Sequence, residues 1–67
     1  MEVQVNGKKS ELPVSVKTIT DLLVHFELDK QVVIVELNES IIDKQVHEKT
    51  EIQDGDKIEL VRFVGGG

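Results

Sequence analysis

The chain has 67 residues, enough for one small domain, and it contains no cysteine, which excludes disulfides, thiolate metal sites and cysteine nucleophiles. It carries 13 acidic and 8 basic residues, a formal net charge of -5, whereas nucleic-acid binders gather Lys and Arg to neutralise phosphates. Phe26 and Phe63 are its only aromatic residues, so bases have no stacking platform. We therefore expect no nucleic acid and a basic protein partner; the alternative is that the net charge only keeps a small protein soluble.

The hydropathy pattern also bears on location. The sequence shows no basic leader followed by an apolar stretch, so a signal peptide is not expected. The longest apolar run, residues 32–35, is far too short to span a bilayer. The expectation is a soluble, cytoplasmic protein with no membrane partner.

The first expected element is a β-hairpin. Residues 1–5 alternate apolar and polar side chains, which is typical of a strand with one buried face. Asn6-Gly7 follows and is the strongest short hairpin signal, because both residues accept positive φ. A two-residue turn places Val5 opposite Lys8 in the return strand, residues 8–12.

A helix is expected next. Thr18 and Asp21 have the spacing of a capping box, with Asp where Glu is more usual. The apolar residues that follow recur at helical spacing and form one face, which should pack on a sheet because so short a helix is unstable alone. These residues are Ile19, Leu22, Leu23 and Phe26. The helix is predicted to end near Leu28.

The remaining segments read as strands and turns. Residues 31–37 are apolar on both faces, which predicts a central strand. A turn at Asn38-Glu39 leads into a short strand at Ile41-Ile42, and residues 43–50 are predicted to be irregular, anchored by Val46. A turn at Asp54-Gly55-Asp56 precedes the last strand, residues 57–64.

This order of elements predicts an α+β protein. A last strand that returns beside the first gives a mixed sheet of four to five strands with one main helix on one face. That arrangement is the β-grasp, or ubiquitin-like, fold. We expect a β-grasp domain over residues 1–64 and a flexible tail over residues 65–67.

The tail is the candidate functional segment. At an average glycine usage of about 7%, three terminal glycines arise by chance in roughly 0.03% of chains, although a frayed terminus or a cloning remnant would look the same. Glycine suits a tail that enters a narrow channel, because it has no Cβ and adopts any φ/ψ the channel requires. The reactive group would be the carboxylate of Gly67, which ATP could activate as an acyl-adenylate for attack by sulfur. Gly65 and Gly66 would tether it.

Over its whole length the chain resembles the ThiS-type sulfur carriers of thiamine biosynthesis. The resemblance lies in residues 1–7, the helix face, residues 33–38, and residues 54–60 followed by the glycines. It implies that a ThiF-type enzyme uses ATP to adenylate Gly67, that a sulfur donor protein converts it to a thiocarboxylate, and that a ThiG-type thiazole synthase takes the sulfur. Gly66 and Gly67 match the terminal pair of the family, and Gly65 is additional. The protein would be a carrier with no bound cofactor, and not an enzyme.

Other functions remain open at this point. MoaD-type carriers of molybdopterin synthesis share the fold, the adenylation and the terminal glycines, but their chains tend to be longer. A β-grasp binding module would make the tail incidental, so its removal would leave binding intact. A protein modifier would form isopeptide adducts on lysines.

Candidate partner-binding residues precede the tail. Val61 and Phe63 share the face of the last strand opposite Ile58 and Leu60, so they would form a docking patch if the helix covers Ile58 and Leu60; the alternative is burial under a loop. Arg62 could pair with a partner's acid, or be solvated. His25 and His47 lack ligand spacing, so no metal site is expected. An acidic edge, solvated or facing a basic partner, is formed by Glu48, Glu51, Asp54 and Asp56.

Overall fold

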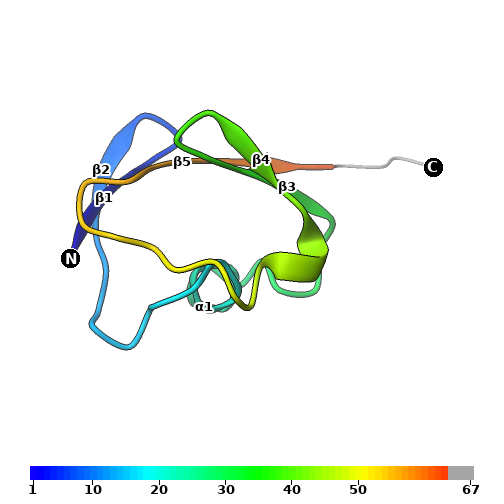
Figure 1. Ribbon diagram of the computed structural model, residues 1–67, viewed down its shortest axis with the longest axis horizontal. Coiled ribbons are helices and arrows are strands. Elements are labelled where there is room, and N and C mark those ends of the chain that lie inside the picture. The colour runs from blue at the N-terminus through cyan, green and yellow to red at the C-terminus, as the bar shows by residue number, and fades with distance from the viewer. Residues whose placement is uncertain (64–67) are drawn as a thin grey trace.

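The structure, a computed structural model, describes residues 1–63. Five strands, one α-helix and one short 3-10 helix follow in the order shown in Figure 1. They are β1 (Glu2–Val5), β2 (Lys8–Glu11), α1 (Ile19–His25), β3 (Val33–Leu37), β4 (Ser40–Ile42), η1 (Lys44–Val46) and β5 (Lys57–Arg62). The predicted boundary between residues 1–64 and the tail 65–67 lies outside the described residues.

The strands form one mixed sheet in the order β2-β1-β5-β3-β4. The last strand, β5, lies in the centre, parallel to β1 and antiparallel to β3. The helix α1 lies on one side of the sheet, and the other side has no covering layer in the described part of the chain (Figure 1). The prediction of a mixed sheet of four to five strands with one main helix is confirmed, and the sheet has five.

The hairpin has the predicted register. Val5 pairs with Lys8, and Val3 pairs with Ser10. Asn6 and Gly7 have φ of 49° and 82°, the left-handed values that a two-residue turn of this kind needs. Side chains at Val3 and Val5 therefore point to the α1 side of the sheet.

The start of α1 follows the prediction, but its end does not. The Thr18 hydroxyl accepts from the Asp21 N–H, and the Asp21 carboxylate accepts from the Thr18 N–H, which completes the capping box. The helix ends at His25, before the predicted Leu28, because Glu27 adopts φ of 59°. The Leu28 N–H then donates to the Leu23 carbonyl at 2.7 Å, which closes a Schellman turn.

The hydrophobic core lies between α1 and the sheet. Ile19 and Leu22 from α1 meet Val35 and Ile58 from the sheet, and all four side chains are fully buried. Together with these, the buried apolar set comprises Val3, Leu12, Val16, Leu23 and Ile52. Phe26, predicted on the same helix face, follows the helix end and is partly exposed.

The predicted central strand is confirmed, because β3 lies between β5 and β4 in the sheet. Only one of its faces is covered, so Ile34 is 46% exposed and Val32 before it is also exposed. The prediction that Val46 anchors residues 43–50 is wrong, because Val46 is exposed. His47 is buried in its place, with its Nε2 3.0 Å from the Ile42 carbonyl oxygen, and this contact attaches η1 to the end of β4.

Candidate functional site

The predicted reactive residues, Gly65, Gly66 and Gly67, lie outside the described residues. The structure does describe the strand that leads to them. That strand, β5, crosses the centre of the sheet from the Asp54-Gly55-Asp56 turn, where Gly55 has the expected positive φ of 88°. The geometry of the site is therefore the geometry of β5 and its neighbours.

An asparagine from the hairpin turn holds the middle of β5. The Asn6 carboxamide accepts from the Leu60 N–H at 2.7 Å and donates to the Leu60 carbonyl at 3.2 Å. The Asn6 N–H also donates to the Ile58 carbonyl at 2.9 Å. The hairpin turn thus extends the β1 contact two residues further along β5 than strand pairing alone, which stops at Ile58.

A second asparagine holds the start of β5 from the other side. In the β3–β4 turn, the Asn38 carboxamide oxygen accepts from the Lys57 N–H at 2.9 Å, and its nitrogen donates to the Asp56 carboxylate at 3.1 Å. Asp56 also accepts from the Gln53 N–H, and Asp54 accepts from the Glu2 N–H. These two acids of the predicted acidic edge are hydrogen-bonded within the fold itself, Asp54 to the start of β1 and Asp56 to two turns.

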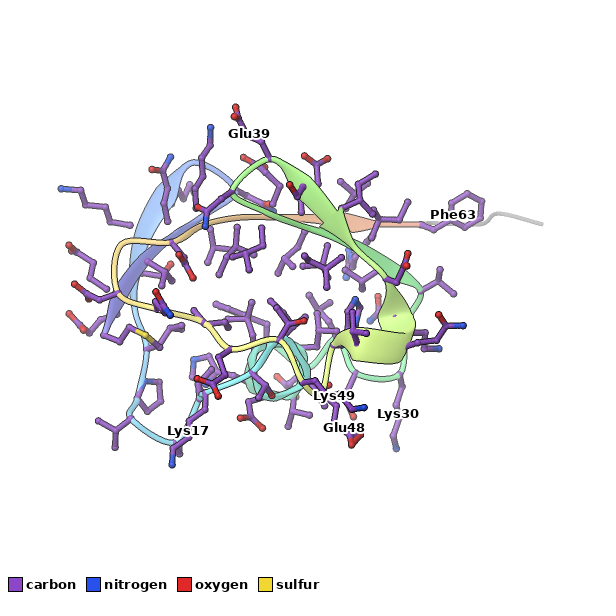
Figure 2. All side chains as sticks on the ribbon, viewed as in Figure 1. Lys17, Lys30, Glu39, Glu48, Lys49 and Phe63 are labelled. Carbon is purple, nitrogen blue, oxygen red and sulfur yellow. The ribbon has the colours of Figure 1, made fainter. Side chains whose placement is uncertain are left out.

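The end of β5 has contacts on one side only among the described residues. Its pairing with β3 continues to Arg62 opposite Val33, and the Phe63 N–H donates to the Val32 carbonyl at 3.1 Å. In Figure 2 the Phe63 side chain lies beyond the end of β5 and points away from α1. The described chain thus leaves the sheet at a fixed point.

Exposed apolar side chains gather on the uncovered face around this point. Val61 is 51% exposed and lies directly opposite Ile34, while Phe63 is 70% exposed. The strand alternation places these residues on the face away from the core. We call this set the open-face patch, and it consists of Val32, Ile34, Ile41, Val61 and Phe63.

Two glutamates lie beside the open-face patch. Glu36 and Glu59 are directly opposite each other on β3 and β5, both are half-buried, and Glu36 is also opposite Ile41 of the patch. Neither forms an ion pair within residues 1–63. Like charges at such positions destabilise a sheet, so the Glu36–Glu59 pair opposes folding.

Arg62 lies on the other face. Its partner across the sheet, Val33, packs against the core, so the Arg62 side chain projects to the α1 side. The three predicted partner-binding residues are therefore divided: Val61 and Phe63 belong to the open-face patch, and Arg62 does not. This division follows from the period-two alternation of β5.

The clearest electrostatic features lie away from the end of β5. Hydrogen bonds from the Lys17 and Thr18 backbone N–H groups lower the pKa of the half-buried Asp21 carboxyl. The Glu11 carboxylate, 2.9 Å from the Met1 amine, raises the pKa of that amine.

Within residues 1–63, no three His, Asp or Glu side chains come close enough to hold a metal ion. No helix in that range has the length and apolarity to cross a membrane.

Comparison with known proteins identifies the family. The model of the ThiS family matches residues 3–67, a range that includes all three terminal glycines. The chain belongs to the ThiS family. It is 45% identical over 65 residues to the sulfur carrier protein ThiS of Bacillus subtilis, covering 97% of this chain and 98% of that protein.

A second relative and a solved structure extend this result. A thiazole synthase of Paramagnetospirillum magneticum is 36% identical over 67 residues, which are 100% of this ThiS-family chain and 20% of that protein. The crystal structure of the thiamine biosynthesis protein ThiS of Geobacter metallireducens superposes with a TM-score of 0.84 at 33% identity and covers 100% of both chains. The β-grasp prediction is confirmed.

Sequence reasoning missed several residues that shape the site. Asn6 and Asn38 were identified as turn residues, but not as side chains that hold β5. Nothing local in a turn sequence shows which distant strand its carboxamide will reach. The union of Ile34 with Val61 on one face was also missed, because it depends on the register between β3 and β5.

Proposed function

We propose that this protein is a sulfur carrier of thiamine biosynthesis whose Gly67 carboxylate becomes a thiocarboxylate. The observation that carries the proposal is the family match, because it runs through residue 67 and so includes the glycine tail. The Bacillus subtilis relative, matched over nearly its whole length, is named a sulfur carrier. Its name and that of the Geobacter metallireducens protein favour thiamine over molybdopterin as the destination.

The chemistry requires activation, because a carboxylate is a poor electrophile. A ThiF-type enzyme would transfer AMP from ATP to the Gly67 carboxylate and release pyrophosphate. A sulfur donor at the oxidation level of sulfide then attacks the acyl carbon, the bond from that carbon to the AMP oxygen breaks, and AMP leaves. ATP is bound by the activating enzyme, whose groups stabilise the phosphates; the carrier contributes the acyl group and a slender tether.

The proposed acceptor enzyme is a thiazole synthase of the ThiG type. Support comes from the Paramagnetospirillum magneticum protein, which is named thiazole synthase and contains a segment similar to this whole chain. A carrier joined to its consuming enzyme in one polypeptide works at a high effective concentration.

The open-face patch is the proposed docking surface for the adenylating enzyme. Val61 and Phe63 lie next to the tail, and their exposed side chains continue across β3 through Ile34. Glu36 and Glu59, which have no ion-pair partner within residues 1–63, give a basic group of the enzyme a place beside the patch, which fits the net charge of -5. Apolar side chains at the centre of such a surface supply most of the binding energy.

Intact mass spectrometry tests the proposed chemistry. The chain is incubated with a ThiF-type enzyme, ATP and a sulfur donor, and the expected product has one oxygen replaced by sulfur at Gly67. A chain that lacks Gly66 and Gly67 is the control and should keep its mass. If the full chain also keeps its mass, sulfur carriage is wrong for this system.

The docking surface is tested separately by pyrophosphate release. Val61→Ser with Phe63→Ser should raise the KM of the adenylating enzyme for the carrier, with kcat little changed. Val14→Ser is the matched control, because Val14 is equally apolar and 87% exposed but precedes α1, away from the sheet. Equal KM values for the double variant and the control would remove the patch from the interface.

A further inference from the structure

The α1 side of β5 borders a hollow that the proposed function does not use. It has a volume of about 610 Å³ and lies between the hairpin, the end of β5 and the segment after α1. Val5, Leu28 and Leu60 form its apolar floor, and each packs partly against the core. Polar groups at the hollow come from Lys8, Ser10, Arg62 and Asn6, and the Asn6 carboxamide is already hydrogen-bonded to Leu60.

The strand register places the two cations on the same side of the sheet. Lys8 is opposite Val5, and Arg62 is opposite Val33, so both side chains project toward the α1 side. They come from strands separated only by β1. The hollow thus receives two of the chain's 8 basic side chains.

This concentration of positive charge is unusual in so acidic a chain. The described residues that line the hollow include no Asp or Glu, although the chain has 13 of them. Lys8 and Arg62 are both exposed, and neither forms an ion pair with any of residues 1–63. Two cations above an apolar floor fit a ligand that carries a negative charge on an apolar stem.

The surroundings favour a carboxylate over a phosphate. Phosphate sites generally use helix N-termini and clustered backbone N–H groups, but the helix end at this hollow is the C-terminal end of α1, marked by Phe26 and Leu28. The partial negative charge of that end disfavours a polyanion. A singly charged Glu or Asp side chain carries less charge, and the methylenes of Glu match the floor.

We propose that this hollow binds an acidic side chain of the thiazole synthase. The assignment rests on the proposed function, which supplies the partner. A protein that takes the tail must surround the end of β5, and the hollow and the open-face patch lie on its two sides. The opposite charges of the two sides, Glu36 and Glu59 against Lys8 and Arg62, then fix which face of the carrier meets which part of the synthase.

Charge reversal in the hollow tests the assignment. The dissociation constant of the full chain with the thiazole synthase of the same organism is measured for Lys8→Glu and Arg62→Glu. Each should weaken binding about tenfold, as expected for a partly desolvated charge pair. Lys49→Glu is the matched control, because Lys49 is exposed and lies on the α1 side, away from the end of β5 (Figure 2). Circular dichroism and thermal unfolding confirm that each variant folds.

The outcomes separate the hollow from its alternatives. An inward lysine on an edge strand such as β2 also discourages edge-to-edge pairing; if that is its only role, Lys8→Glu leaves binding of the synthase unchanged and the assignment is overturned. If the unchanged chain binds ATP, and both charge reversals abolish that binding, the hollow is a phosphate site and the assignment to an acidic side chain is overturned. Rescue of Arg62→Glu by reversing one acid of the synthase would establish the pair directly.

The test also separates the hollow from the proposed function. A chain that acquires a thiocarboxylate while both reversals bind the synthase normally contradicts the hollow alone. A chain that binds the synthase with the expected loss in both variants, yet never acquires sulfur, contradicts the proposed chemistry alone. If the unchanged chain does not bind the synthase, the assignment of the hollow is overturned, whether or not mass spectrometry shows a thiocarboxylate.

Discussion

The two halves of β5 differ in how the rest of the molecule holds them. Residues 57–60 contact β1 or its turn on one side and β3 on the other, and Asn6 and Asn38 add side-chain hydrogen bonds to their backbone. Residues 61–63 are held by β3 alone within the described chain. We call these the held half and the free half.

This contrast shows how one strand of a small domain can be fixed in position at its start and accessible to a partner at its end. The held half buries Ile58 and is hydrogen-bonded on both edges, so the position at which the chain leaves the body is well defined. The free half exposes Val61, Arg62 and Phe63, where they can be surrounded by another protein. Stability and recognition are therefore assigned to adjacent residues of one strand.

The largest expected effect comes from the core position of the held half. Ile58→Ala should lower the free energy of unfolding by about 3 kcal/mol, because it leaves a cavity at a fully buried site. Val61→Ala in the free half should change it by less than about 0.5 kcal/mol. Urea denaturation measures both, and similar losses for the two variants would remove the distinction between the halves.

The next effect concerns the hydrogen bonds of Asn6. Asn6→Gly keeps the left-handed turn but loses both side-chain bonds to Leu60, and should cost about 1 kcal/mol. Asn6→Ala adds the penalty for a left-handed alanine, for a total of about 2 kcal/mol. Hydrogen exchange at the Leu60 amide should rise in both variants; unchanged protection there would show that the carboxamide does not hold β5.

A smaller effect of opposite sign is expected at the glutamate pair. Glu59→Gln should raise the free energy of unfolding by about 0.5 kcal/mol, because it removes the repulsion from Glu36, and it should weaken the affinity for the adenylating enzyme. Glu48→Gln, on an exposed glutamate away from the open-face patch (Figure 2), is the control and should change neither. If Glu59→Gln gains stability but keeps its full affinity for the adenylating enzyme, that enzyme does not use the glutamate pair.

The smallest expected effect is a pH dependence far from β5. The pKa of the Asp21 carboxyl is lowered from its ordinary value of 3.8 by backbone hydrogen bonds, so its stabilisation is present above that value and is lost as pH falls through the lower, folded-state pKa. Asp21→Asn should make stability less dependent on pH below about pH 4. An acid unfolding curve identical to that of the unchanged chain would contradict this.

The sequence predicted most of the fold because its local signals were strong. Alternation in residues 1–5, the Asn6-Gly7 turn and the Thr18–Asp21 capping box each specify a local geometry, and the structure has all three. The early end of α1 was missed because a left-handed Glu27 lacks the glycine that usually marks such a turn.

Less of the candidate site could be predicted, because it depends on contacts distant in sequence. The exposure of Val61 and Phe63 followed from strand alternation, but their union with Ile34 required the β3–β5 register. The hollow required Lys8 and Arg62 to line the same side of the sheet, and the bonds from Asn6 to Leu60 join residues 54 positions apart. The terminal glycines stood out by their number and position, only the family resemblance assigned them sulfur as cargo, and that role stays a prediction.

The most direct test of the central claim follows sulfur itself. The chain is loaded with isotopically labelled sulfur by the adenylating enzyme, purified, and mixed with thiazole synthase and its other substrates for a single turnover. Sulfur carriage predicts that the label leaves the carrier and appears in the thiazole ring, while Gly67 returns to a carboxylate. Label that remains on the carrier, or a carrier found attached to lysines of other proteins, would contradict the account.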